Sequence, residues 1–352
     1  MITLLIPTIN RFYFIKKYLI YLNASGFNGQ VLIGDSSDES NFDATKNYIE
    51  SNIFTFEVTQ YSFPDMYPHQ CIKKMLTDIK FPYSMFICDD DIVVVNTLKK
   101  CIKFLDHNQS YSGVGGVSVL LKLNPDNYNN ILSSFAYRVR EYESQTASER
   151  VIDFFSNYSV INYSVGRTEE FICRWPDDVN GENYDKAIGT EVLPSVILAA
   201  QGKVKMLDKL FVVRQLHEDR IILPTFVDTI LHPQWVTTMH FAVDKLSGVV
   251  SSIDEISYNK AYITVNNAWE EYLVDTMRNA YCSHDSSVFQ QILIKVKLLF
   301  GSKILSKFLK IYQLITLFTN KESVRLPALL KSSSPYYADF KEIYDVIEGH
   351  DR

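Results

Sequence analysis

Short apolar runs alternate with longer segments of helical spacing over the first ninety residues. Three runs are too short for amphipathic helices and too uniformly apolar for half-exposed strands, which is typical of buried parallel strands: Ile2–Ile6, Val31–Gly34 and Tyr83–Cys88. Helical spacing appears at residues 10–22, 43–51 and 67–79, and a β-rich run at 54–61. Strands that alternate with helices of about 10–15 residues indicate βαβ units. The pattern predicts an α/β fold, with a mostly parallel, Rossmann-like sheet flanked by helices.

Polar side chains stand at the point where each predicted strand ends. Thr8, Asn10 and Arg11 follow the first strand, Asp35 ends the second, and Asp89–Asp91 follows the third. Ligands of parallel sheets bind outside the carboxyl ends of the strands. We therefore expect the functional site at this edge of the sheet.

Glycine-rich phosphate motifs do not explain that edge. The sequence has no GxGxxG after its first strand and no GxxxxGK[ST], which argues against a dinucleotide site and a P-loop. The nearest candidate, Ser112–Gly116, is predicted to be a turn that enters a strand at Val117–Leu121.

The chain changes character beyond Asp228, where long helical patterns replace strands. We expect a catalytic unit at residues 1–225, divided into halves of about 1–95 and 96–225. Residues 226–352 are predicted to form a mainly helical extension.

Charge is distributed unevenly along the 352 residues, which carry a net charge of −6. The window Val288–Lys321 contains six lysines and no acid, so the rest of the chain holds 29 basic against 41 acidic residues, a net charge of −12. Nucleic-acid binding needs a basic footprint, and an acidic body argues against it.

The segment 288–321 also repeats apolar residues at three- to five-residue steps between its lysines. Basic amphipathic helices bind anionic membrane surfaces, which predicts a peripheral contact with the cytoplasmic face of a membrane. The alternative is a helix pair that packs on the acidic body or on a second copy in a homodimer.

The five cysteines are widely spaced and form no CxxC pair. Together with the lack of a signal-peptide pattern or an apolar stretch of about 20 residues, they predict a cytoplasmic protein that is soluble or peripheral.

The acidic triplet Asp89–Asp91 predicts a divalent metal. Three adjacent carboxylates repel one another unless a cation is present, and Mg²⁺ and Mn²⁺ prefer oxygen ligands. In an extended chain Asp89 and Asp91 share one side and Asp90 faces away. The alternative is a solvated turn that caps the following helix.

Several segments, in this order, resemble the GT-A glycosyltransferases, in particular family-two-like bacterial enzymes of surface-polysaccharide synthesis. They are Leu5–Arg11, Ile33–Ser37, Pro82–Asp91, Tyr163–Glu169 and Gly189–Glu191. The resemblance covers about residues 1–220 and implies a GT-A fold and transfer of a sugar from a nucleotide-sugar donor, with a UDP-sugar favoured.

The resemblance also assigns donor-side roles. Residues implied to line the donor pocket are Pro7, Thr8, Asn10, Arg11, Asp35, Asp89 and Asp90. Asp89 and Asp91 are implied to hold Mn²⁺ or Mg²⁺ on the diphosphate, with His217 as a further ligand. For Asp35 the alternative is an Asx turn with the following serines.

On the acceptor side, Glu191 stands where the family places its base, which takes the proton of the acceptor hydroxyl during inverting transfer. The alternatives are an ordinary first-turn glutamate or a base among Asp177, Asp178, Glu182 and Asp185. Arg167 and Trp175 are expected to contact a glycan or lipid-linked acceptor.

Two other functions stay open. A nucleotidyltransferase shares the sheet and the metal carboxylates, but it normally needs a glycine-rich basic loop that Pro7–Arg11 lacks. The other is a non-catalytic GT-A-like scaffold that binds glycans.

Overall fold

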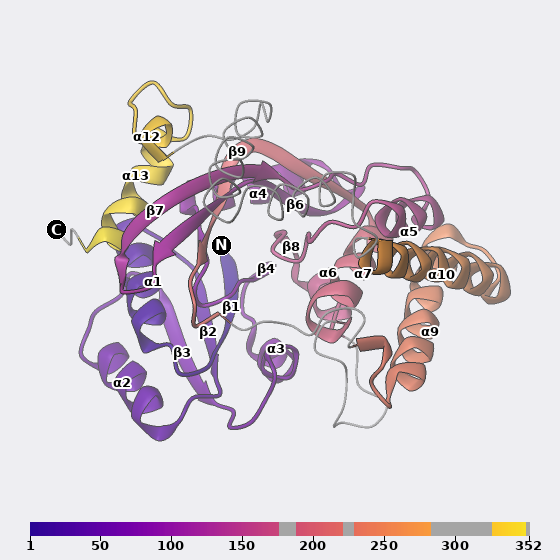
Figure 1. Cartoon of the computed structure of the whole chain (residues 1–352), viewed down its shortest axis with the longest axis horizontal. Coiled ribbons are helices and arrows are strands. Elements are labelled where there is room, and N and C mark those ends of the chain that lie inside the picture. Colours follow the sequence, from indigo (N-terminus) through magenta and orange to yellow (C-terminus); the bar gives the residue numbers. More distant parts are fainter. Residues whose placement is uncertain (176–187, 221–228, 283–325, 350–352) are drawn as a thin grey trace, which may run out of the picture.

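The computed structural model describes residues 1–175, 188–220, 229–282 and 326–349. Its first sheet has the strand order β3-β2-β1-β4-β8. Four of these strands run parallel, and the short β8 is antiparallel to β4. The bounds are β1 Ile2–Thr8, β2 Gln30–Asp35, β3 Glu57–Ser62, β4 Tyr83–Phe86 and β8 Gly166–Arg167. The predicted α/β fold with a mainly parallel sheet is confirmed (Figure 1).

Both faces of the first sheet are covered, as its uniformly apolar strands require. Leu4 and Ile6 face a core shared with α1, whereas Leu5 faces a second cluster with α3. The helices that follow these strands are α1 Phe12–Ala24, α2 Glu39–Glu50 and α3 Pro68–Met75, with a 3₁₀ turn at Leu76–Asp78. A Cβ at Gly34 would lie 2.8 Å from Cys71 Cβ, so glycine lets α3 approach β2 closely.

A second sheet has the order β5-β9-β6-β7. Its long strands are β6 Tyr111–Asn124, β7 Asn127–Arg138 and β9 Lys203–Leu216, and β5 Ile92–Val93 lies at its edge. The predicted turn at Ser112–Gly116 is wrong, because these residues lie inside β6 and pair with β9. Three glycines allow the crowding there: a Cβ at Gly116 would lie 2.6 Å from the carbonyl oxygen of Lys209.

The second sheet uses its two faces differently. Val117, Val119 and Leu121 of β6 are buried in the first core, together with residues of α4 Val95–His107. Ser118 and Leu120, which alternate with them, point to the other face and line a cavity.

A group of helices in the middle of the chain forms a second core. They are α5 Ala147–Ser156, a π-helical turn at Ile188–Val192, α7 Leu193–Gln201, α9 Trp235–Asp254 and α10 Tyr258–Cys282, whose buried apolar side chains form one cluster that includes Trp269. Helix α6 Thr168–Cys173 packs in a separate cluster through Phe171. In Figure 1, α9 and α10 lie at the end of the molecule away from α1 and α2.

The last described residues return to the N-terminal half. Helices α12 Leu326–Leu329 and α13 Tyr337–Glu348 place Leu329, Phe340 and Ile343 in the first core. Lys17 of α1 donates to Asn129 Oδ1 (2.6 Å) and to the carbonyl of Ile347, which ties the end of α13 to α1 and β7. The described part of the predicted extension is therefore helical, but it packs against both cores.

The basic segment 288–321 lies outside the described residues, so its membrane or dimer contact stays a prediction. Within the described ranges, the structure contains no helix with the length and apolar character of a membrane span.

Candidate active site

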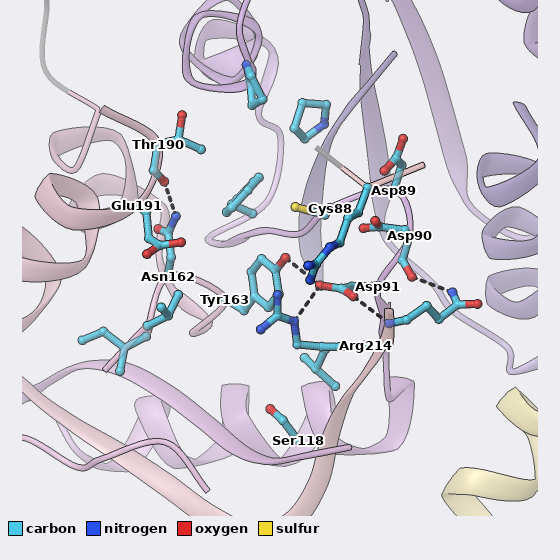
Figure 2. Close-up of a pocket in the computed structure, with 18 of the residues that line it drawn as sticks. Cys88, Asp89, Asp90, Asp91, Ser118, Asn162, Tyr163, Thr190, Glu191 and Arg214 are labelled. Atoms are coloured by element: carbon cyan, nitrogen blue, oxygen red, sulfur yellow. Dashed lines mark hydrogen bonds and ion pairs between the residues drawn. The ribbon is translucent and has the colours of Figure 1, made fainter. Parts of the chain in front are cut away.

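A cavity of about 970 Å³ opens between the carboxyl ends of β1 and β4 and the inner face of the second sheet. Pro7, Thr8 and Cys88 through Asp91 come from the first sheet, and Ser118, Tyr137 and Arg214 from the second. Asn162, Tyr163, Thr190 and Glu191 form the remaining wall. Figure 2 shows the aspartates and Glu191 on opposite sides, with Tyr163 between them.

Asp89 is buried and held by residues at the end of β1. Its carboxylate accepts hydrogen bonds from Thr8 Oγ1 (2.6 Å) and Arg11 Nη1 (3.0 Å). Burial and the neighbouring Asp90 raise the pKa of Asp89 to about 7, although Arg11 opposes this shift.

Asp90 is held by Arg11 and His217. Its Oδ2 lies 3.2 Å from Arg11 Nη1 and 2.9 Å from His217 Nε2. The His217 ring packs against Phe14 (4.4 Å between centroids) and Tyr128 (5.3 Å), which fixes its orientation. His217 therefore contacts a carboxylate of the triplet directly.

Asp91 reaches further toward the second sheet. It accepts hydrogen bonds from Tyr163 Oη (2.7 Å), Arg214 Nε (3.1 Å) and the backbone N–H of Gln215 (3.2 Å). Burial and the charge of Asp90 still raise the pKa of Asp91 to about 6. A nearby cation stabilises the ionised form of such a buried carboxylate and lowers its pKa.

The geometry of the triplet fits a divalent cation. Among the described residues, one ligand atom each from Cys88, Asp90 and Asp91 lies within 4.8 Å of the others. Burial and the adjacent carboxylates raise the pKa of the Cys88 thiol well above its ordinary value, so it stays protonated and is a poor ligand for a hard ion. Asp90 and Asp91 could hold Mg²⁺ or Mn²⁺ through their carboxylates.

This group differs from the predicted ligand set of Asp89, Asp91 and His217. Asp89 is not in the group of three, because its oxygens are turned toward Thr8 and Arg11. His217 Nε2 forms a hydrogen bond with Asp90 Oδ2, and His217 is not in the group of three that could hold a metal. The sequence predicted an extended chain at Asp89–Asp91. This is wrong, because residues 89–90 form a turn after β4.

Two of the predicted donor-pocket residues support the loop after β2. Asp35 accepts hydrogen bonds from the backbone N–H of Ser37 (2.9 Å) and from Gln60 Nε2 (2.8 Å), as in the Asx-turn alternative. Asn10 adopts a left-handed backbone (φ 54°), and its Oδ1 accepts from the N–H of Asp38 (2.8 Å). Pro7, Thr8 and Arg11 line the cavity, whereas Asp35 and Asn10 do not.

Glu191 lines the wall opposite the aspartates. It lies in the π-helical turn Ile188–Val192, immediately before α7, and Tyr158 donates a hydrogen bond to its carboxylate. The turn before α7 is therefore wider than an α-helical turn, and π-helical turns of this kind are frequent at functional sites. The alternative bases at 177, 178, 182 and 185 lie outside the described residues.

The two predicted acceptor contacts do not line this cavity. Arg167 donates to the carbonyls of Tyr111 (2.8 Å) and Leu105 (2.7 Å), and so links β8 to the helix and strand beside it. Trp175 is buried against Phe86 and Phe171 and is part of the core.

The sequence did not single out Tyr163, Asn162 or Tyr158, although all three contact site residues. Tyr163 begins one of the segments on which the resemblance rests, which was the available signal. Nothing in the local sequence indicates that Tyr158, two residues after α5, donates a hydrogen bond to Glu191.

The similarities of this chain to known proteins are similarities of structure. No protein-family model matches the chain, and no curated protein sequence does. The fold is similar to crystal structures of S. aureus TarS 1–349, at 14% identity over 82% of this chain and 76% of that one, with a TM-score of 0.48. The complex of the same protein with UDP-GlcNAc gives 14% identity, coverages of 82% and 77%, and a TM-score of 0.49.

A mannosyltransferase from Pyrobaculum calidifontis, in complex with GDP-Man and Mn²⁺, is 12% identical over 99% of this chain and 86% of that chain, with a TM-score of 0.41. At these identities and TM-scores, neither likeness says what this chain does.

Proposed function

We propose that the chain is a metal-dependent, inverting glycosyltransferase that uses a nucleotide-sugar donor. One observation carries the proposal: the carboxylates of Asp90 and Asp91 and the carboxylate of Glu191 line opposite sides of one cavity. An inverting transfer needs these two functions on the two sides of the reacting carbon, a cation for the leaving diphosphate and a base for the acceptor.

On the donor side, Asp90 and Asp91 would hold Mn²⁺ or Mg²⁺, which supplies Lewis-acid stabilisation to the departing diphosphate. Arg214 and Arg220 line the same cavity and add positive charge for phosphate oxygens. Thr8 and Arg11 fix Asp89 beside them, where its backbone and side chain would border the nucleoside. A UDP-sugar is the favoured donor.

On the acceptor side, the carboxylate of Glu191 accepts the proton of the attacking hydroxyl as the hydroxyl oxygen bonds to the anomeric carbon. The bond from that carbon to the donor phosphate breaks at the same time. The acceptor is proposed to be a glycan or a lipid-linked glycan of surface-polysaccharide synthesis. A cytoplasmic protein at the inner membrane face suits this acceptor, and 288–321 would supply the contact.

Replacing the base tests this assignment. Glu191→Gln should leave Mn²⁺-dependent donor binding unchanged and lower kcat by about 10²–10⁴-fold, since it removes the proton acceptor but keeps the shape. A thermal-shift screen of UDP-, GDP-, CMP- and dTDP-sugars with Mn²⁺ identifies the donor, and release of the nucleotide diphosphate reports turnover. Glu39→Gln, at an exposed position on α2, is the matched control. Full turnover by Glu191→Gln would contradict the proposed role.

The same assays separate the other two functions. A nucleotidyltransferase would release pyrophosphate from a nucleoside triphosphate and a sugar phosphate. A non-catalytic scaffold would bind glycans and show no Mn²⁺-dependent nucleotide binding.

A further inference from the structure

The turn that carries Glu191 is held from three directions. Asn162 Nδ2 donates to the carbonyl oxygen of Thr190 (2.6 Å), and His69 Nδ1 lies 3.2 Å from Thr190 Oγ1. Tyr158 donates to Glu191 Oε1. His69 belongs to α3, which packs on β1 and β2, whereas Tyr158 follows α5. The backbone and the side chain of this turn are thus fixed by separate parts of the fold.

Tyr158 is itself held rigidly. Its ring packs against Phe154 (5.4 Å between centroids) and Tyr272 (5.5 Å), so helices α5 and α10 determine where its hydroxyl lies. Burial and the charge of Glu191 raise the pKa of Tyr158, and its hydroxyl therefore remains a donor over the working pH range. An ionised carboxylate can only accept, which settles the direction of this hydrogen bond.

The contact engages one oxygen of the carboxylate. No described residue is shown to donate to Glu191 Oε2, whereas Oε1 is taken by Tyr158. Such a contact fixes the orientation of the carboxylate and leaves its other oxygen for an acceptor hydroxyl.

We propose that Tyr158 is the positioning residue of the catalytic base: its hydrogen bond orients the carboxylate of Glu191 toward the cavity. This inference rests on the proposed function, because it takes Glu191 to be the base. It predicts that the tyrosine hydroxyl affects the chemical step and not the binding of the donor.

Tyr158→Phe removes the hydroxyl and keeps the ring. We expect kcat to fall about tenfold with the KM for the donor unchanged, because the base is less well oriented for the chemical step while the donor site is intact. Tyr142→Phe is the control for the loss of a buried hydroxyl, since this tyrosine is buried in the same core and donates to the carbonyl of Asn157 (3.0 Å) and not to Glu191. It should leave kcat unchanged.

A stability measurement keeps this inference separate from the proposed function. The thermal midpoints of wild type, Tyr158→Phe, Glu191→Gln and the double variant form a cycle that needs no substrate. We expect the two single changes to be non-additive, because both remove the same hydrogen bond. Such a coupling, with no turnover by the wild type, would overturn the enzyme assignment alone. Turnover by Tyr158→Phe at the wild-type rate, or additive midpoints, would overturn the role of Tyr158.

Discussion

Buried ionisable side chains set the chemistry of this site. Repulsion among the three adjacent carboxylates, expected from the sequence, appears as a raised pKa of Asp89 and of Asp91, with burial as the largest cause and Asp90 as the next. The partners of these carboxylates come from the distant residues Arg11, Tyr163 and Arg214. No local pattern indicates such partners, because the fold alone brings residues more than 70 positions apart into contact.

His69 is a buried ionisable side chain outside the acidic triplet, and its effect on stability can be tested. Burial, and then the charge of Lys73, lower its pKa to about 4, so the folded protein keeps this histidine neutral while the unfolded chain binds a proton below about 6.5. Stability that depends on His69 should be lost as the pH falls from about 6.5 to about 4, by up to about 3 kcal/mol.

Chemical denaturation of wild type and His69→Gln between pH 4 and 7.5 measures this effect. The variant should show a flatter dependence of its unfolding free energy on pH, and His107→Gln, at an exposed position, should follow the wild type. Parallel curves for wild type and His69→Gln would contradict the buried neutral state.

At the scale of elements, the strands of the first sheet follow directly from their apolar runs. β1, β2 and β4 lie where the sequence predicts them, because strands covered on both faces read as uninterrupted apolar stretches. The glycine-rich start of β6 misled the prediction: glycine favours turns, but here it permits close packing against β9 and Leu198. The π-helical turn at Glu191 was not predicted either, since the sequence pattern indicates only a helix that begins near Glu191.

Helix α13 provides a prediction at this scale. Phe340 is fully buried in the first core although it lies far along the chain. Phe340→Ala should lower the unfolding free energy by about 3–5 kcal/mol, because it removes a large buried side chain and leaves a cavity.

Urea denaturation followed by circular dichroism measures that loss. Ala338→Ser, on the exposed side of the same helix, should change the unfolding free energy by less than about 0.5 kcal/mol. Equal effects of the two substitutions would show that α13 does not contribute to the core.

At the scale of the whole molecule, the site exists because two sheets meet. The carboxyl ends of β1 and β4 were predictable from the βαβ pattern, and so was the presence of polar groups there. The second sheet, which supplies Tyr137, Ser118 and Arg214, was not predicted as a wall of the site. Its strands β6 and β9 pair across more than 90 residues, and such long-range pairing leaves no mark in a local window.

In the proposed mechanism, Asp91 binds a cation that the donor needs. Isothermal titration calorimetry of the nucleotide diphosphate selected by the screen tests it most directly, with wild type and Asp91→Asn, in Mn²⁺ and in EDTA. We predict binding by the wild type in Mn²⁺, and affinity at least about 100-fold lower both in EDTA and in the variant, because the carboxylate charge that holds the cation is lost. Equal affinity of Asp91→Asn and the wild type, or binding that is unchanged in EDTA, would contradict the account.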